Sequence, residues 1–574
     1  MDDHIKIAIC QIEPTVGDIK GNKEKILAAR LEAAKMGADL CVFCELVVSG
    51  YPPEDLVQKP AYQRACARAV EELASATGDG GPAMIVGAPH FGLAESLTEN
   101  LAENKDQRLQ ERPFNAVFLL ADGVIVAERH KKELPNYGVF DEPRRFTPGE
   151  GPPNPIPFRG LSLGLLVCED MWRPGVAEKL AEAGADLLIA PHGSPFRDTA
   201  RNDRASAARK CCQATGLPIV FVNQLAGQDE IVFDGASFVM AAQGDIAYRA
   251  KQFLPGIFLT EWKRADDGAL GCIVGPSYAW HEGDEEIYRA VVLGVRDYVE
   301  KNRFPGVVIG LSGGVDSALT AAIAVDALGA NRVRCVMLPS RYTSKDSLID
   351  AEQCAKALGV QYDTIQIEPT VAAFGEVLGP VFNGRAADTT EENIQSRIRG
   401  VILMALSNKF GEMVLTTGNK SEMSVGYATL YGDMNGGYNP LKDIYKTDAY
   451  NLCHWRNSVK DHGFHGPEGI VIPENIITKA PSAELREDQT DQDSLPPYDV
   501  LDGILERLVE REMSVREIIA DGFDEDTIRK IEHLLYVAEY KRRQAPPGPK
   551  VTQVNFGRDR RYPITNGWRD RGDY

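Results

Sequence analysis

The chain has 574 residues, with 83 acidic against 63 basic side chains and a formal net charge of -20. This length exceeds what one hydrophobic core supports, so we expect two large domains or three ordinary ones. The negative charge repels polyanions and argues against a nucleic-acid partner, although a local basic pocket could still hold a small anion. No apolar run reaches 18 residues and the first residues lack a basic leader, so we expect a cytoplasmic protein with no membrane partner.

In the first 262 residues, short β-rich runs alternate with helical stretches. These runs are "KIAICQI", "DLCVFCEL", "AMIVGAP", "NAVFLLADGVIVAERH", "LSLGLLVCED", "ADLLIAPHG" and "LPIVFVNQ". Several of them are apolar throughout, which favours strands that are covered on both faces by helices. The pattern predicts a layered α/β domain over residues 1–262.

Residues 263–286 lose this periodicity and gain Gly, Pro and acidic side chains, so they are predicted to form a linker. A second α/β domain is predicted over 287–574, beginning with a helix near 287–298. Its expected strands are "VVIGL", "VRCVML", "DTIQI" and "MVLTTGN", separated by helices such as 316–329 and 345–358. Such parallel sheets bind ligands beyond the carboxyl ends of their strands.

The cysteines give little support for a metal or redox site. Cys41 and Cys44 form the CxxC pair, but alternation along a strand would turn their side chains to opposite faces, and no second pair follows at zinc-like spacing. A second cluster consists of Cys453, His454, His462 and His465. It contains a single thiolate, whereas a structural zinc site usually recruits more than one. We therefore expect buried free thiols.

The stretch "LSGGVDSA", residues 311–318, follows a predicted strand and precedes a predicted helix. Its backbone N–H groups and the helix N-terminus are typical of an anion site, and Gly313 and Gly314 allow a tight turn. No lysine follows the glycines as in a kinase-like P-loop; Asp316 stands there instead. An acid beside phosphates favours a Mg²⁺ ligand, and a plain helix N-terminal acid is the alternative.

This Ser-Gly-Gly-x-Asp-Ser string resembles the pyrophosphatase loop of the N-type ATP pyrophosphatases, which cleave ATP between its α and β phosphates. The resemblance implies a doubly wound parallel sheet of the adenine nucleotide α-hydrolase type. It also implies that the loop holds the leaving pyrophosphate, with ATP contacts from Gly310, Leu311, Ser312, Gly313, Gly314, Val315, Asp316 and Ser317.

Three downstream segments distinguish among the families that share this loop. "EENIQSRIRGVILMALSN", "VLTTGNKSEMSVGYATLYGDMNGGYNPLKDIYKTDAY" and "PSAELREDQTDQDSLPPYD" resemble NAD synthetase over nearly all of residues 285–555. The resemblance implies ATP contacts at Thr417, Arg399 and Lys446, and deamido-NAD contacts at Asn393, Glu422 and Lys541. Glu422 would complete a Mg²⁺ site with Asp316. For Arg399 and Lys446 a purely structural role, such as a surface ion pair, stays open.

The C-terminal tail after residue 540 is rich in Lys and Arg, a composition typical of a disordered, solvated end. The implied role of Lys541 requires its beginning to be ordered.

In the first domain, three residues with complementary chemistry follow predicted strands: Glu45, Lys131 and Cys168. A cysteine nucleophile needs a base and a positive neighbour because its thiol is mostly protonated near neutral pH. A buried structural thiol is the alternative for Cys168.

With "LPNYGVFDE" and "GSPF", these positions resemble the nitrilase (carbon–nitrogen hydrolase) superfamily in its glutaminase form over residues 4–262, which implies an α-β-β-α sandwich. On that resemblance Glu45 is the general base, Cys168 the nucleophile and Lys131, in preference to Lys132, the oxyanion-stabilising residue. Glutamine binding is assigned to Tyr137, Glu142, Ser194 and Arg201, with Glu142 also supporting the triad. The sequence "SPFRDTARNDR" departs from the family pattern, so Arg197 and Arg204 compete with Arg201.

Joined in this order, the two halves resemble glutamine-dependent NAD synthetases. The implied reaction uses ammonia from glutamine to amidate deamido-NAD through an adenylated intermediate, with ATP and Mg²⁺, and releases AMP, pyrophosphate and glutamate. An ammonia-only synthetase with a non-catalytic N-terminal scaffold and an RNA-modifying adenylase are the alternatives. The same families lead us to expect a homo-oligomer that acts on small molecules.

Overall fold

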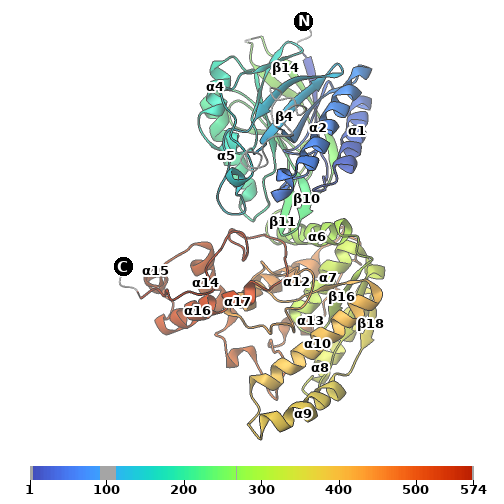
Figure 1. The fold of residues 1–574 in the computed structure, drawn as a ribbon, viewed down its shortest axis with the longest axis vertical. Helices are drawn as coiled ribbons and strands as arrows, with labels where there is room; N and C mark the ends of the chain where they lie inside the picture. The colour runs from blue at the N-terminus through green and yellow to red at the C-terminus, as the bar shows by residue number, and fades with distance from the viewer. Residues whose placement is uncertain (1–3, 91–111, 267, 572–574) are drawn as a thin grey trace, which may run out of the picture. The chain divides into compact units, whose positions relative to one another are not determined.

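The computed structural model describes residues 4–90, 112–266 and 268–571. The chain forms two compact units: residues 1–228 with 233–281, and residues 229–232 with 282–574. Figure 1 shows the first unit in blue to green and the second mainly in green to red. Within the described ranges, no helix is both long and apolar enough to cross a membrane.

The first unit contains two mixed β-sheets. The seven-stranded sheet has the order β15-β14-β1-β2-β3-β4-β5, with β1 (His4–Gln11), β2 (Leu40–Val42), β3 (Ala83–His90), β4 (Phe114–Ala121), β5 (Val124–His130), β14 (Gly256–Arg264) and β15 (Leu270–Val274). The six-stranded sheet has the order β13-β12-β9-β8-β7-β6, with β6 (Ile156–Phe158), β7 (Leu161–Leu165), β8 (Leu187–His192), β9 (Ile219–Asn223), β12 (Phe238–Met240) and β13 (Ile246–Arg249). β10 (Leu225–Gln228) and β11 (Ile231–Asp234) form a separate pair.

The two sheets are stacked between helices, with α1 (Ile19–Lys35) and α2 (Pro60–Ala76) on one side and α4 (Val176–Glu182) and α5 (Ala200–Thr215) on the other (Figure 1). Along β1, Ile7 and Ile9 join the apolar core between the sheets, while Ala8 and Cys10 join the core beneath α1 and α2. The predicted α-β-β-α sandwich is confirmed. The expectation that several strands are covered by helices on both faces was wrong, because the second sheet covers one face and excludes water as well as helices do.

The second unit is built on a fully parallel sheet with the order β18-β17-β16-β19. Its strands are β16 (Val307–Gly310), β17 (Val333–Met337), β18 (Gln361–Thr364) and β19 (Met413–Leu415). Its helices are α6 (Asp284–Lys301), α7 (Val315–Leu328), α8 (Lys345–Leu358), α9 (Glu368–Phe382), α10 (Thr389–Phe410), α11 (Lys420–Val425), α12 (Lys446–Ser458), α13 (Glu474–Thr478), α14 (Tyr498–Leu505), α15 (Val515–Ala520), α16 (Glu525–Val537) and α17 (Glu539–Arg542).

The strand order makes β16 the point where the chain changes direction across the sheet. From β16 the chain moves by way of α7 to β17 on one side, and it returns much later to β19 on the other. In doubly wound sheets a crevice opens at such a point, beyond the carboxyl ends of the two strands. The predicted doubly wound fold is confirmed, and the crevice position falls on the loop after β16.

Two segments differ from expectation. Within the predicted linker, β15 extends the seven-stranded sheet, and only Leu270 of its five residues is buried, so the sequence shows no alternation there. The tail has no regular helix or strand after α17 within the described residues, yet Lys550, Phe556 and Arg560 are buried. The solvated end that composition alone indicates therefore does not apply to this part of the chain, whereas the implied role of Lys541 requires the beginning of the tail to be ordered.

The cysteines are free, as expected. Cys41 and Cys44 belong to the same apolar cluster beneath α1 and α2, because β2 ends at Val42 and alternation stops before Cys44. The zinc alternative gains no support: among the described residues, no group of three or more His, Cys, Asp or Glu side chains could hold a metal ion.

Candidate functional sites

Cys168 lies in a strained turn between β7 and the short helix α3 (Glu169–Trp172). Its backbone has φ 46° and ψ -97°, and its side chain is buried. A positive φ is unfavourable for a residue with a Cβ, and such strain persists where surrounding contacts enforce it. One of these contacts is the N–H of Cys168, which donates to the carbonyl oxygen of Pro191 at 3.0 Å.

Glu45 follows β2 and its carboxylate is fully buried. It accepts hydrogen bonds from Lys131 Nζ at 2.7 Å, from Asn115 Nδ2 at 2.7 Å and from the N–H of Gly193 at 3.0 Å. Three donors from separate parts of the unit therefore fix the position of this carboxylate.

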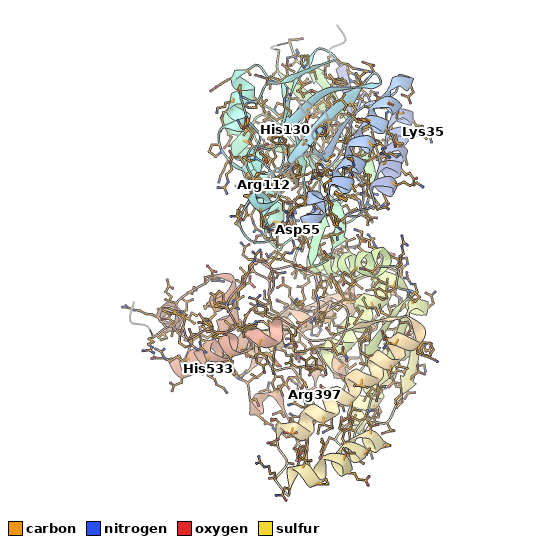
Figure 2. The ribbon with its side chains drawn as sticks, in the orientation of Figure 1. Lys35, Asp55, Arg112, His130, Arg397 and His533 are labelled. Atoms are coloured by element: carbon orange, nitrogen blue, oxygen red, sulfur yellow. The ribbon has the colours of Figure 1, made fainter. Side chains whose placement is uncertain are left out.

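Lys131 directly follows His130, the last residue of β5 (Figure 2). Its buried ammonium also donates to Glu142 Oε1 at 2.9 Å, and Tyr51 donates to the same oxygen at 2.9 Å. Burial alone would lower the pKa of Lys131, but the carboxylates of Glu142 and Glu45 raise it well above its usual value. Lys131 is therefore a buried cation held between two carboxylates. The competing Lys132 instead donates to the carbonyl of Gly151 at 2.5 Å.

The surroundings keep the Cys168 thiol protonated at rest. Burial and the nearby Glu45 carboxylate raise its pKa well above the usual value, and Lys131 acts in the opposite direction. Burial also raises the pKa of Glu142 to about 7, although Lys131 lowers it. A nucleophilic Cys168 therefore requires proton removal at the moment of attack, with Glu45 as the available base.

The predicted glutamine contacts are engaged with protein groups. Tyr137 is about half exposed and donates to Glu169 Oε2 at 2.8 Å. The hydroxyl of Ser194 accepts from Arg204 Nε at 3.0 Å, and Arg204 Nη1 also donates to Asp234 Oδ1 at 2.7 Å. Arg204 is thus the buried arginine that contacts Ser194, whereas the predicted Arg201 donates to the carbonyl of His281 at 2.6 Å.

Asp170 is a residue of this site that the sequence interpretation missed. Its Oδ1 accepts from the N–H groups of Lys132 at 3.0 Å and Glu133 at 2.9 Å, and its Oδ2 accepts from that of Val167 at 3.1 Å. One buried carboxylate thus ties the lysine loop to the cysteine turn. Its place two residues after Cys168 in "CED" was the available signal.

In the second unit, the loop after β16 is closed by its own serines. The hydroxyls of Ser312 and Ser317 lie 3.1 Å apart, and the N–H of Gly314 donates to the Ser312 hydroxyl at 3.2 Å. Gly313 has φ 81°, and a Cβ there would lie 2.4 Å from the carbonyl oxygen of Ser347. Only glycine fits this position, and the turn leads directly into the N-terminus of α7.

Asp316 is the second residue of α7 and is held by two other elements. Its Oδ1 accepts from Asn419 Nδ2 at 3.0 Å, and its Oδ2 pairs with Lys446 Nζ at 2.5 Å. Glu422 Oε1 lies 3.6 Å from the same Lys446 nitrogen. Burial would lower the pKa of Lys446, but Asp316 and Glu422 raise it. The structure therefore places Lys446 between the two predicted Mg²⁺ ligands.

These groups border a cavity of about 310 Å³ beyond the carboxyl ends of β16 and β19. The predicted residues that line it are Gly310, Leu311, Ser312, Gly314, Val315, Asp316, Ser317, Arg399, Thr417, Glu422 and Lys446. Lining residues that the sequence interpretation did not single out include Thr343, Ser347, Lys479, Glu484 and Asp491. Most of these additional residues lie in helices or irregular segments and do not follow an apolar strand, so the sequence pattern does not mark them.

The remaining assignments in this unit differ in their contacts. Arg399 lines the cavity, donates to the carbonyl of Leu338 at 2.9 Å and has a pKa lowered by burial to about 10, which does not fit a surface ion pair. Asn393 accepts from the hydroxyl of Thr429 at 2.8 Å. Lys541 donates to the carbonyls of Gly426 and Ala428, both at 2.7 Å. The structure thus shows Asn393 and Lys541 bound to protein groups.

Acidic side chains outnumber basic ones in the lining of the cavity. Burial and the nearby Asp316 carboxylate raise the pKa of Glu422 to about 8, against the influence of Lys446. Mg²⁺ typically takes one or two carboxylates from the protein and completes its shell with phosphate oxygens and water. The carboxylates of Asp316 and Glu422, beside the loop after β16, would fit that requirement.

Together, the fold and the two sites define a two-domain enzyme. One unit carries a thiol, a carboxylate and a lysine in a layered α/β sandwich, and the other carries a glycine-containing loop at the N-terminus of a helix, beside a cavity with acidic side chains. A carbon–nitrogen hydrolase family model matches residues 6–269, and an NAD synthase family model matches residues 287–545.

Similar proteins share this arrangement over their whole length. The chain is 49% identical to the glutamine-dependent NAD(+) synthetase of Rhodobacter capsulatus over 576 residues, which cover all of both chains, and 44% identical to that of Xanthomonas campestris pv. campestris, with 98% of each chain covered. The solved structure of the Acinetobacter baumannii glutamine-dependent NAD+ synthetase in complex with ADP is 40% identical, with 99% of each chain covered and a TM-score of 0.76. The chain belongs to the glutamine-dependent NAD(+) synthetase family.

Proposed function

We propose that this enzyme converts deamido-NAD to NAD with ammonia that it takes from glutamine, at the expense of ATP. The products are NAD, glutamate, AMP and pyrophosphate. The observation that carries this proposal is the intact cluster of Glu45, Lys131 and Cys168 in a chain that also holds the Ser312–Ser317 loop over its cavity. The full-length relatives support this function rather than an ammonia-only synthetase or an RNA-modifying adenylase.

In the hydrolase unit, Glu45 removes the proton of the Cys168 thiol as its sulfur attacks the side-chain amide carbon of glutamine. Lys131 stabilises the negative oxygen that forms on that carbon. The ammonium of Lys131 has three hydrogens and two hydrogen-bond acceptors within the described residues, so one hydrogen is available for this oxygen. Glu45 passes the proton to the departing ammonia, then activates the water that hydrolyses the thioester to glutamate.

In the synthetase unit, the carboxylate of deamido-NAD attacks the α-phosphorus of ATP, and pyrophosphate leaves toward the loop after β16. Ammonia then attacks the activated acyl carbon and AMP departs. Backbone N–H groups at the start of α7 and the ammonium of Lys446 stabilise the phosphate charge, so positioning and charge neutralisation carry most of the catalysis. We assign Asn393 and Lys541 to the dinucleotide; both would have to exchange protein contacts for substrate.

We assign Mg²⁺ binding to Asp316 and Glu422. When bound there, the ion would neutralise the ATP phosphates and stabilise the leaving pyrophosphate. Lys446, which pairs with both carboxylates, would then turn its hydrogens toward the phosphates.

The test uses pure protein with ATP, Mg²⁺, deamido-NAD and amide-¹⁵N glutamine, followed by mass spectrometry of the dinucleotide. We expect labelled NAD and an equal amount of AMP. Cys168→Ala should abolish labelling from glutamine and leave synthesis from ammonium intact, while Asp316→Asn should remove both. Cys66→Ala, another buried free thiol in the same unit, serves as the matched control. If wild-type protein makes no NAD even with added ammonium, the proposed function is wrong.

We further propose that the protein acts on small molecules as a homo-oligomer in the cytoplasm and does not bind nucleic acid. The net charge of -20 supports the last point, because polyanions are repelled. Light scattering on the purified protein tests the assembly, and a tRNA filter-binding assay tests the RNA alternative.

A further inference from the structure

Lys420 is a fully buried lysine that the proposed mechanism does not use. It is the first residue of α11 and belongs to the run "TGNKSE", which also contains the metal-ligand candidate Glu422. A fully buried lysine is rare in proteins unless its charge is paired. Its position, one residue after Asn419 and two before Glu422, suggests a role in the adjacent cavity.

The contacts of Lys420, however, are all with the protein. Its ammonium pairs with Asp443 Oδ1 at 2.8 Å and with Glu510 Oε1, and it donates to Thr552 Oγ1 at 2.7 Å and the carbonyl of Val554 at 2.8 Å. Four acceptors surround three hydrogens, so no hydrogen is left for a substrate. Burial would lower its pKa, but the two carboxylates raise it, which keeps the side chain charged.

Of the residues on either side of Lys420 in the sequence, Asn419 contacts a residue that lines the cavity of the synthetase unit, and Glu422 lines that cavity itself. Asn419 Nδ2 donates to Asp316 Oδ1 at 3.0 Å, and Asn419 Oδ1 caps α11 by accepting from the N–H of Glu422 at 2.9 Å. Glu422 in turn lies 3.6 Å from the Lys446 nitrogen. The start of α11 therefore lines the cavity through Glu422 and holds the lining residue Asp316 through Asn419, while Lys420 contacts the C-terminal tail.

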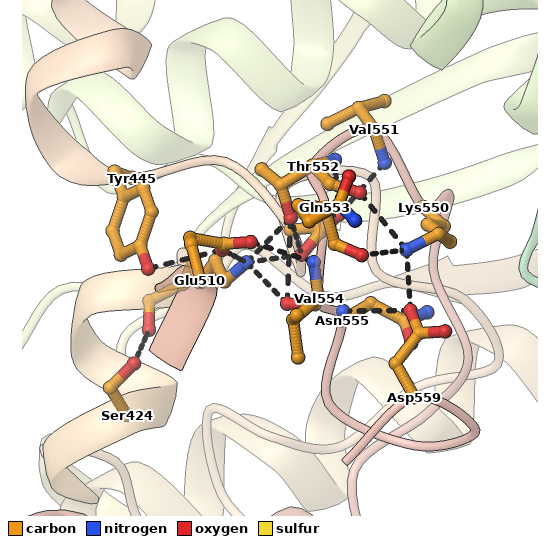
Figure 3. A network of polar contacts seen from close by, with 12 residues as sticks. Ser424, Tyr445, Glu510, Lys550, Val551, Thr552, Gln553, Val554, Asn555 and Asp559 are labelled. Atoms are coloured by element: carbon orange, nitrogen blue, oxygen red, sulfur yellow. Dashed lines mark hydrogen bonds and ion pairs between the residues drawn. The ribbon is translucent and has the colours of Figure 1, made fainter. Parts of the chain in front are cut away.

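The tail is fixed on its own side of this contact. Asp443 Oδ2 accepts from the N–H groups of Val551 and Thr552, both at 2.8 Å, and Glu510 Oε2 accepts from the N–H of Val554 at 2.6 Å. Figure 3 shows Glu510, Thr552 and Val554 gathered in this network. The two carboxylates that neutralise Lys420 thus also bind the backbone of residues 551–554.

We propose that Lys420 is a positioning residue, and that it and tail residues 551–554 form a clamp that holds α11 so that Glu422 lines the cavity and Asn419 holds Asp316 beside it. The tail is then part of the synthetase site although it does not touch the reacting atoms. The inference rests on the proposed synthetase activity, but the placement of α11 can be measured without it.

The decisive variant is Thr552→Val, which keeps the side-chain shape and removes the hydroxyl that links Lys420 to Asp443. We expect ammonia-driven kcat to fall about tenfold, as for the loss of one well-placed hydrogen bond to a charged group, and half-saturating Mg²⁺ to rise. Amide hydrogen exchange should accelerate in residues 419–425, while glutaminase activity stays unchanged. Lys420→Met should lower kcat by more than about 100-fold because it leaves two buried carboxylates unpaired.

The matched control is Arg334→Met. Arg334 also pairs with two carboxylates of the same unit, Asp363 at 2.9 Å and Glu412 at 3.0 Å, but it lies on β17 and has no role in the clamp. It should lower the melting temperature without accelerating exchange in 419–425. The proposal would be overturned if Thr552→Val left both kcat and the amide exchange of residues 419–425 unchanged. It would also be overturned if exchange in those residues were equal in Thr552→Val and Arg334→Met. If wild-type protein makes no NAD, the proposed function falls, while the exchange result still decides the clamp.

Discussion

The carboxylate of Asp170 offers a sharp test of how the hydrolase site is held together. It accepts three backbone N–H groups, two from the loop that carries Lys131 and one from the turn that carries Cys168. Asp170→Asn keeps the size of the side chain. The amide can still accept with its single oxygen, but an NH₂ group then replaces the second oxygen and faces a backbone donor.

The magnitude follows from counting those bonds. If the amide oxygen of the Asp170→Asn side chain keeps the hydrogen bonds from the N–H groups of Lys132 and Glu133, the hydrogen bond from the N–H of Val167 is lost. The new NH₂ group and the N–H of Val167 are then two donors that face each other. Losing a hydrogen bond to a charged group and leaving a buried N–H unpaired costs about 2–3 kcal/mol. Where that cost falls on the reactive geometry, glutaminase kcat should drop about 30- to 150-fold, since about 1.4 kcal/mol corresponds to tenfold.

The assay measures glutamate release with and without the synthetase substrates, alongside ammonia-driven NAD synthesis. We expect a lower kcat for glutamine, a nearly unchanged KM and normal ammonia-driven synthesis. Asp186→Asn is the matched control, because Asp186 also accepts a backbone N–H, that of Ser162 at 2.8 Å, at the edge of the same unit. A folded Asp170→Asn protein with full glutaminase kcat would refute the reasoning.

Two further predictions concern the loop and the buried acid. Gly313→Ala should lower ammonia-driven synthesis more than about 100-fold, because its Cβ would lie 2.4 Å from the Ser347 carbonyl oxygen in a turn with positive φ. Gly314→Ala should lower it less than about tenfold, because the Cβ there meets nothing closer than 3.4 Å. Equal losses of activity in the two variants would contradict the geometry. The pKa of Glu142 is raised from 4.5 to about 7, so its contribution to stability is complete below pH 4.5 and lost as pH rises through 7. Urea unfolding should therefore show that the difference in free energy of unfolding between wild type and Glu142→Gln changes by about 3 kcal/mol between about pH 4.5 and 8, with wild type losing its advantage as the pH rises. A difference that stays constant with pH would exclude the raised pKa of Glu142.

The position of the candidate catalytic cluster could be predicted because strands end where apolar runs end. Glu45, Lys131 and Cys168 each follow such a run, and the two stacked sheets bring those ends together. The same reasoning places the loop after β16 beside Thr417, which follows β19, since the two strands are parallel neighbours. In both units, local sequence pattern and sheet topology indicate which side chains lie close together, whereas the roles proposed for them rest on the family resemblance.

Contacts made by irregular segments could not be predicted in this way. Arg201 and Arg204 are both on α5, and only the helix rotation decides that Arg204 meets Ser194. The tail is basic in composition, but two of its cations, Lys550 and Arg560, find buried carboxylate partners within the described residues. Composition shows which side chains are charged but not whether those charges are paired in the folded protein. A buried segment with paired charges therefore has the same composition as a solvated one.

Three buried lysines show how far the surroundings decide function. Lys131, Lys420 and Lys446 each lie between two carboxylates, and sequence alone does not distinguish them. Lys420 has four protein acceptors for three hydrogens, so it can hold structure but cannot bind a substrate. Lys131 has two hydrogen-bond acceptors within the described part of the chain, and Lys446 lines the cavity with one partner at 2.5 Å and another at 3.6 Å. The number of hydrogens left over on a buried lysine therefore separates Lys131 and Lys446, which can stabilise reacting oxygens, from Lys420, which can only hold neighbouring protein groups in place.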